Sequence, residues 1–189
     1  MKAKLILILI AMLLPLAGWS QSVQLGVGVR TSLLGYTEDE LDSTKMFWGG
    51  HGRLMAFKYF AGEVSIQKRD DNFNVGNGNI RLDTVPLQVS AVVFPLAMLP
   101  VSPYFVVGTG WYFLTATISG DLDLPFVTGE GSIDHTETAY HVGVGVEGFI
   151  GKHFSVGADV RKIFLDFETS IISYSVDAYF VNVGATFYF

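Results

Sequence analysis

The chain ends in Tyr179-Phe-Val-Asn-Val-Gly-Ala-Thr-Phe-Tyr-Phe189, and this stretch decides the fold. Counted back in twos from Phe189, every residue is apolar or aromatic, while the residues between them include Asn182 and Gly184. Successive side chains of a β-strand point to opposite faces, so this alternation predicts a strand with one apolar and one more polar face. About ten residues is also the length of a tilted strand that crosses a bilayer.

The composition is too apolar for an ordinary water-soluble domain, since 50% of the 189 residues are hydrophobic and only 16% are charged. The one long apolar run is Leu5–Leu16, which follows Lys2 and Lys4 and precedes the small residues Gly18 and Ser20. This order is typical of a secretory signal peptide and predicts cleavage near residue 20. The alternative is an uncleaved membrane anchor, which the shortness of the apolar run disfavours.

The chain contains no cysteine, which excludes both a lipid-anchored lipoprotein and a disulfide framework. An exported chain of this kind must be stabilised by a closed, hydrogen-bonded sheet. Once Lys2 and Lys4 leave with the signal peptide, the mature chain keeps 18 acidic residues but only 10 of its 12 basic ones. Such a negative surface argues against nucleic acid as a partner.

Seven further segments alternate in the same way before the final strand. They cover about 22–34, 47–57, 60–69, 81–94, 103–119, 137–149 and 154–167. Between them lie polar loops at 36–45, 70–79 and 120–135 and shorter turns that contain Gly or Pro. Pro86 lacks a backbone donor and predicts a bulge or a strand end. The pattern predicts an all-β fold: a signal peptide over residues 1–20, then an eight-stranded antiparallel up-and-down transmembrane β-barrel over residues 21–189.

A soluble, lipocalin-like barrel has the same alternation but places its apolar face inside. Two observations favour the membrane barrel. The strands carry too few charges to cover an exterior in water, and aromatic residues gather near strand ends, as in the aromatic girdles of membrane barrels. These aromatic residues are Trp48, Tyr59, Phe60, Tyr104, Phe154, Tyr179, Phe187 and Phe189.

Two pairs of segments resemble a known superfamily. The first pair is Val85-Pro-Leu-Gln-Val-Ser-Ala-Val-Val-Phe-Pro95 with Pro103-Tyr-Phe-Val-Val-Gly-Thr-Gly-Trp-Tyr112. The second is Tyr140-His-Val-Gly-Val-Gly-Val-Glu-Gly-Phe149 with Phe154-Ser-Val-Gly-Ala-Asp-Val-Arg161. Together with the terminal aromatic residue, they resemble the small OmpA/OmpX/OmpW-like outer-membrane barrels.

The resemblance implies residence in the outer membrane of a Gram-negative bacterium, in contact with outer-membrane lipids and lipopolysaccharide. It also implies that the barrel-assembly machinery recognises the last strand. The residues expected to form this assembly signal are Tyr179, Val181, Val183, Phe187 and Phe189.

The face that points away from lipid carries charged and titratable residues. They are Arg30, His51, Arg53, Glu63, His141, Glu147, Asp159 and Arg161. The interior of an eight-stranded barrel is only wide enough for side chains, and an unpaired buried ion costs several kcal/mol. We therefore expect a salt-bridged polar plug. The alternative is a narrow, gated conduit in which the ion pairs exchange partners.

An apolar patch of the lumen is also expected. Its residues are Phe105, Val107, Trp111, Phe113 and Phe180. The OmpW-like resemblance associates such a patch with the passage of a small hydrophobic ligand, although residues of this kind more often fill the interior.

Signals for catalysis, metals or cofactors are weak. His153 and Ser155 form a faint His-x-Ser pair, but no acid is placed to orient the histidine. Carboxylates that could hold a divalent cation near lipopolysaccharide are Glu38, Asp39, Glu40, Asp42, Asp121, Asp123, Glu130 and Asp134. The sequence predicts a non-enzymatic barrel without a catalytic, metal or cofactor site and with a structural or surface-interaction role. The alternatives are a channel for small hydrophobic solutes and, more remotely, a lipid A-modifying enzyme.

Overall fold

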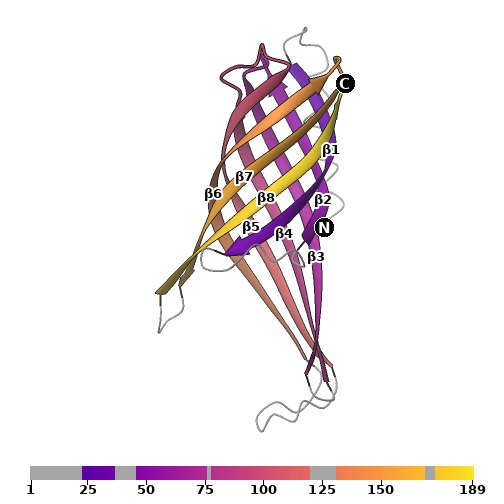
Figure 1. Ribbon diagram of the computed structural model, residues 1–189. Coiled ribbons are helices and arrows are strands. Elements are labelled where there is room, and N and C mark those ends of the chain that lie inside the picture. The colour runs from indigo at the N-terminus through magenta and orange to yellow at the C-terminus, as the bar shows by residue number, and fades with distance from the viewer. Residues whose placement is uncertain (1–22, 37–45, 76–77, 120–130, 169–172) are drawn as a thin grey trace, which may run out of the picture.

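A computed structural model describes residues 23–36, 46–75, 78–119, 131–168 and 173–189. Their strands form a closed barrel in which each strand pairs antiparallel with its neighbours in the chain (Figure 1). The strands are β1 Val23–Tyr36, β2 Met46–Ala56, β3 Phe60–Val75, β4 Gly78–Val93, β5 Val101–Ser119, β6 Gly131–Ile150, β7 Phe154–Glu168 and β8 Ser173–Tyr188. The predicted eight-stranded up-and-down barrel is confirmed. The predicted signal peptide lies outside the described residues.

The terminal strand β8 closes the barrel by pairing with β1. β8 pairs with β1 from Gly26↔Tyr188 to Tyr36↔Ala178, and Phe189 N donates to Leu25 O at 2.9 Å. A closed sheet leaves no unpaired strand edge in lipid, where each unsatisfied backbone group is costly. Within the described residues, no helix is long and apolar enough to span a membrane.

Two hairpins are longer than the sequence predicts. β3 and β4 continue to Val75↔Gly78, and β5 and β6 continue to Ile118↔Gly131, so most of the predicted loop 70–79 and residues 131–135 are strand. Asn and Gly have low strand propensity, but here the cross-strand ladder outweighs it. β5 and β6 have 19 and 20 residues, about twice the length needed to span a bilayer. β3–β6 therefore extend beyond the rest of the barrel (Figure 1).

Pro86 lies within β4 and causes neither a bulge nor a strand end. The register between β3 and β4 is the same on both sides of it, at Ile66↔Leu87 and Arg69↔Thr84, and only the intervening positions are unpaired. On its other side, Pro86 remains paired with Tyr112 of β5. The missing N–H interrupts one ladder locally, and the other ladder holds the strand in place.

The outer surface of the barrel is an apolar belt. In β4 it runs from Val85 to Val93, about 20 Å along the membrane normal for a strand tilted by about 40°. Exposed aromatic residues border it at both ends: Phe57, Tyr59, Phe60, Phe154, Phe187 and Phe189 at the end with the short turns, and Trp48, Trp111, Phe113 and Tyr140 at the other. Tyr104, predicted in a girdle, is instead buried inside the barrel. The exposed apolar surface fits a lipid environment.

The turn between β2 and β3 has an unusual backbone. Phe57 has φ 53° and Lys58 has φ 63°, both in the left-handed region. Tight hairpin turns of this kind normally contain Asn or Gly, because a side chain with a Cβ is strained there by about 1–3 kcal/mol. Gly151, in the turn between β6 and β7, has φ 68° without such strain.

Candidate functional site in the barrel interior

The interior of the barrel is layered, with an apolar cluster at each end. At the turn end, the buried cluster is Met55, Ala61, Val92, Phe94, Tyr104, Val106 and Tyr188. At the loop end, it is Phe47, Tyr112, Ala139, Ile163, Ala178 and Phe180. Charged and polar side chains fill the space between the two clusters. The interior is therefore a polar layer between two apolar clusters.

Most large polar side chains lie beside an inward glycine of a neighbouring strand; Glu63, which pairs with Arg53 and Ser90, is an exception. His51 pairs with Gly28, His141 with Gly108, and Arg161 with Gly143; similar pairs join Arg30 to Gly49 and Gly184, Arg53 to Gly26, Tyr104 and Asp159 to Gly145, and Glu147 to Gly157. A Cβ on Gly145 would lie 2.5 Å from Tyr104 Cζ and 2.6 Å from Asp159 Cβ. The alternation of large and small residues is what lets a narrow barrel hold these side chains.

Glu63 of β3 is the centre of the polar layer, where it accepts hydrogen bonds from three arginines. Arg30 binds it through both terminal nitrogens, at 2.6 and 2.8 Å. Arg53 donates to Oε2 at 2.6 and 3.1 Å, and Arg161 donates to Oε1 at 3.0 Å. The Glu63 side chain has no exposed surface. Four strands are therefore connected by one carboxylate.

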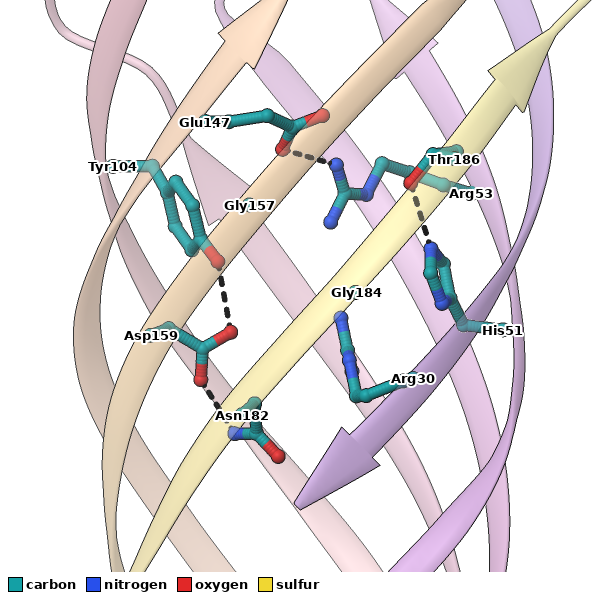
Figure 2. A pocket seen from close by; sticks show the side chains of 10 residues that line it. All are labelled: Arg30, His51, Arg53, Tyr104, Glu147, Gly157, Asp159, Asn182, Gly184 and Thr186. Atoms are coloured by element: carbon teal, nitrogen blue, oxygen red, sulfur yellow. Dashed lines mark hydrogen bonds and ion pairs between the residues drawn. The ribbon is translucent and has the colours of Figure 1, made fainter. Parts of the chain in front are cut away.

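Asp159 and Glu147 balance the remaining positive charge. Asp159 accepts hydrogen bonds from the Tyr104 hydroxyl at 2.8 Å and from the Asn182 amide at 2.6 Å (Figure 2). It also accepts one from Arg161 Nε at 2.8 Å.

Glu147 is ion-paired with Arg53 and accepts hydrogen bonds from Ser155 at 2.6 Å and Tyr188 at 3.0 Å. Among the described residues, the polar layer carries three arginines and three carboxylates and is therefore neutral. Its hydrogen bonds offset part of the cost of burying ions.

The two interior histidines lie at the margins of this network. His51 Nε2 is 2.9 Å from the Thr186 hydroxyl, and His141 Nε2 is 2.9 Å from the Ser90 hydroxyl. Both rings therefore act as hydrogen-bonding members of the packed interior.

The space left between these side chains is small. A cavity of about 10 Å³ is lined by Arg30, His51, Arg53, Tyr104, Glu147, Gly157, Asp159, Asn182, Gly184 and Thr186 (Figure 2). This volume is about the minimum that one water molecule needs. It is far below the volume of an organic ligand.

All eight residues of the expected polar cluster lie in this layer, and each is at most 6% exposed. The apolar lining is different, because only Phe180, at 2% exposed, faces inward. The interpretation of the other four as lumen residues is wrong. Phe105, Val107, Trp111 and Phe113 are 37–57% exposed on the outer face. β5 is apolar or aromatic on both faces, so its alternation does not identify the inner one.

The sequence interpretation missed the uncharged part of the network. Its members are Ser32, Gln67, Gln88, Ser90, Tyr104, Tyr112, Ser155, Asn182, Thr186 and Tyr188. Most of them occupy the same alternate positions along their strands as the charged residues. This alternation is the sequence signal that could have identified them. Tyr104 and Tyr112 escape this signal because both faces of β5 are similar in polarity.

The His-x-Ser pair does not form a catalytic pair. Ser155 is 1% exposed and donates to Glu147 inside the barrel. His153 lies on the exposed turn after β6, where Nδ1 is 2.9 Å from the carbonyl oxygen of Tyr188.

Within the described ranges, no group of three His, Asp or Glu side chains is arranged to hold a metal ion. Asp134 Oδ1 accepts a hydrogen bond from the Thr115 hydroxyl at 2.8 Å. The other predicted loop carboxylates lie outside the described residues.

The residues of the expected assembly signal share the outer face of β8. Val183, Phe187 and Phe189 are 47–68% exposed, and Tyr179 and Val181 are half-buried. Phe187 packs edge-on against Phe189 and stacks on His153. Their recognition by the assembly machinery stays a prediction.

Residues 3–189 match the profile of the family described as "Outer membrane protein beta-barrel domain". The chain belongs to this family. Membership agrees with the closed barrel and its apolar belt, and the protein is accordingly an outer-membrane β-barrel of Gram-negative type. No protein of curated function matches the sequence significantly.

Solved outer-membrane barrels share the fold at low identity. A major outer membrane protein from Thermus thermophilus aligns with a TM-score of 0.55 and 12% identity over 88% of this chain and 99% of that one. Ail of Yersinia pestis gives 0.52 and 15% over 89% and 98%. The N-terminal β-barrel domain of Pseudomonas aeruginosa OprF gives 0.52 and 13% over 87% and 97%. At these identities the likeness concerns the fold alone.

Proposed function

We propose that this protein is a non-conducting, non-enzymatic outer-membrane barrel with a structural or surface-interaction role. One observation carries the proposal: two apolar clusters enclose a neutral, hydrogen-bonded layer whose cavity is only about 10 Å³. A conducting pore needs a continuous path of water, because an ion that leaves water without replacement ligands pays a large desolvation cost. The cavity between the polar side chains has room for about one water molecule.

Exchange of ion-pair partners does not easily open this layer. Glu63 accepts bonds from three arginines at once, so moving its carboxylate separates several charge-assisted hydrogen bonds together. Each such bond contributes about 1.5–3 kcal/mol. Even with these bonds broken, the apolar clusters that contain Phe94 at one end and Phe180 at the other would remain.

Planar-bilayer recording tests the sealed barrel. The purified, folded protein is expected to give no reproducible single-channel steps, while a porin added to the same bilayer verifies the recording. Steady steps from the native protein would overturn the proposal in favour of a channel. Passage of small hydrophobic solutes is tested by uptake into vesicles with and without the protein, and we expect equal rates.

The surface role is supported by the length of β3–β6. β6 pairs with β7 only from Ala139 onward, so residues 131–138 belong to the extension and pair with β5 alone in the described chain. Ile133 is 66% exposed there. In outer-membrane barrels the longer connections face outward and the short turns face the periplasm. The extension would then stand above the lipopolysaccharide leaflet, accessible to other molecules.

Thiol labelling of intact cells tests this orientation, and the cysteine-free chain makes each new thiol unique. With a large, membrane-impermeant maleimide, Ile133→Cys is expected to react in intact cells. The matched variant Lys152→Cys, on the opposite rim, is expected to react only after the outer membrane is permeabilised. The reverse pattern would place the extension in the periplasm.

The absence of enzymatic activity is supported by the burial of Ser155 and its bond to Glu147. Expression of the protein is expected to leave the mass spectrum of lipid A unchanged. A new lipid A species that depends on the protein would establish an enzyme instead.

A further inference from the structure

The short-turn end of the barrel has an apolar and cationic rim. Its three turns, residues 57–59, 94–100 and 151–153, are called the turn collar here. Phe94 N donates to Tyr59 O at 2.8 Å, Phe149 N to Pro100 O at 2.9 Å, and Tyr188 N to His153 O at 2.7 Å. These bonds connect the turns and the terminal strand into a continuous rim.

Large apolar side chains of the turn collar point away from the barrel. Met98 is 88% exposed, Phe57 66%, Leu96 52% and Leu99 48%. Ala97 of the same turn packs against the apolar cluster inside the barrel, so the turn is fixed across the barrel end. Grouped apolar residues of this size are unfavourable in water and mark a surface that meets another apolar phase.

The backbone of the turn 94–100 is prepared for an environment with little water. Pro95 and Pro100 have no N–H group. Leu96 O accepts from Leu99 N at 3.0 Å, and the buried Ser102 hydroxyl lies 3.1 Å from Leu96 O and 3.0 Å from Leu99 O. Backbone groups that are satisfied internally, or missing, can leave water at low cost.

The charged side chains of the turn collar are all positive. Lys58 and Lys152 are exposed, and the three turns contain no Asp or Glu. The opposite rim differs, since Lys68 and Arg81 there are ion-paired with Asp70. The strained backbone of Phe57 and Lys58 also holds one aromatic and one cationic side chain outward at the same turn.

We propose that the turn collar binds anionic phospholipid headgroups of the periplasmic leaflet. Met98, Leu96, Leu99 and Phe57 enter the boundary between headgroups and acyl chains, while the ammonium groups of Lys58 and Lys152 contact phosphates. Lysine is suited to this position because its aliphatic stem lies along apolar surface while its charge stays in the headgroup region. The collar continues the lipid-facing belt. The proposal rests on the proposed orientation of the short turns toward the periplasm and is independent of whether the barrel conducts.

Fluorescence quenching tests the depth of the collar. An environment-sensitive fluorophore is attached to Met98→Cys and, as a matched control, to Ile133→Cys, an exposed apolar site on the other rim. In vesicles of phosphatidylethanolamine and phosphatidylglycerol, we expect lipids brominated on their acyl chains to quench the label at position 98. Iodide in the water should quench this label at least threefold less than it quenches the control label. Equal iodide quenching would place the collar in water, available to a periplasmic protein instead, and would overturn the proposal.

Charge reversal tests the headgroup preference. The native protein is expected to unfold at a higher temperature in vesicles that contain phosphatidylglycerol than in pure phosphatidylcholine, as followed by the gel mobility of unboiled samples. Lys58→Glu/Lys152→Glu should lose this difference, and Lys58→Arg/Lys152→Arg should retain it. If the Glu variant keeps the full dependence on phosphatidylglycerol, the two lysines do not bind the headgroups and the proposal fails.

Discussion

Removal of the charge on Glu63 is expected to destabilise the barrel strongly while leaving its shape unchanged. Glu63→Gln preserves the volume of the side chain but leaves three buried arginines facing two carboxylates. Arg53 keeps Glu147 and Arg161 keeps Asp159, whereas Arg30 donates both of its charge-assisted hydrogen bonds to Glu63. Removing one partner of a buried ion pair costs about 3–5 kcal/mol, because the other charge is left uncompensated. We expect a loss of that size.

A second substitution should recover most of this loss. Arg30→Met removes the uncompensated charge and fills much of the same space, so Glu63→Gln/Arg30→Met is expected to lie within about 1–2 kcal/mol of the native protein. The two effects should not add, since residues in direct contact typically have coupling energies of about 0.5–3 kcal/mol. The exposed pair of Lys68 and Asp70 is the control, and Asp70→Asn should leave stability unchanged.

Urea unfolding in lipid vesicles measures these differences, with the folded fraction read from the mobility of unboiled samples on a gel. The reasoning would be refuted in either of two ways. Glu63→Gln could be as stable as the native barrel, or the double variant could be as unstable as Glu63→Gln alone. The second result would mean that the uncompensated charge of Arg30 is not the source of the loss.

Three further predictions concern packing, facing and assembly. Gly145→Ala should lower the free energy of unfolding by about 1–3 kcal/mol in the same urea assay, because the new Cβ overlaps neighbouring side chains. Gly52→Ala is the control and should show no such loss, because no atom lies within 4 Å of its added Cβ. Trp111 is 37% exposed on the outer face, so its fluorescence should be quenched by brominated lipids in Trp48→Phe refolded from residues 21–189, where Trp111 is then the one tryptophan. Unquenched emission would mean that Trp111 faces the lumen. Deletion of Phe189 should reduce the fraction of protein assembled in the outer membrane, measured by heat-modifiable mobility of membrane fractions, and normal assembly would contradict its role as a signal.

Much of the barrel can be predicted from strands whose two faces differ in polarity. In β6, for example, Val142 and Val144 alternate with His141 and Glu147, and the strand and its inner face are both predicted correctly. β5 shows the limit of this approach. Its outward Phe105 and inward Tyr104 are both aromatic, so polarity assigns the strand but not its facing.

Strand ends are harder to predict because local propensity and sheet pairing disagree there. Asn74 pairs with Asn79, residues typical of turns, because the hairpin ladder continues through them. The periodicity of the sequence also does not predict which side chains form hydrogen bonds with one another inside the barrel. Arg161 reaches Glu63 across 98 residues of chain, a contact fixed only when the barrel closes. The glycines beside large polar residues are a signal that can be recognised only once the strand register is known.

The order of charges along the chain bears on how this barrel enters a membrane. β1 and β2 each contribute one buried arginine, β3 and β6 each contribute one carboxylate, and β7 contributes one of each sign, Asp159 and Arg161. A sheet of the first two strands alone therefore presents two positive charges on the face destined for the interior, and it becomes neutral only after later strands arrive.

Inserting such hairpins one at a time would place unbalanced ions against hydrocarbon, at a cost of several kcal/mol each. A cooperative passage, in which the strands curl around their charges before lipid surrounds them, avoids that intermediate. The ion pairs that fill the finished barrel thus also favour an all-or-none route into the membrane.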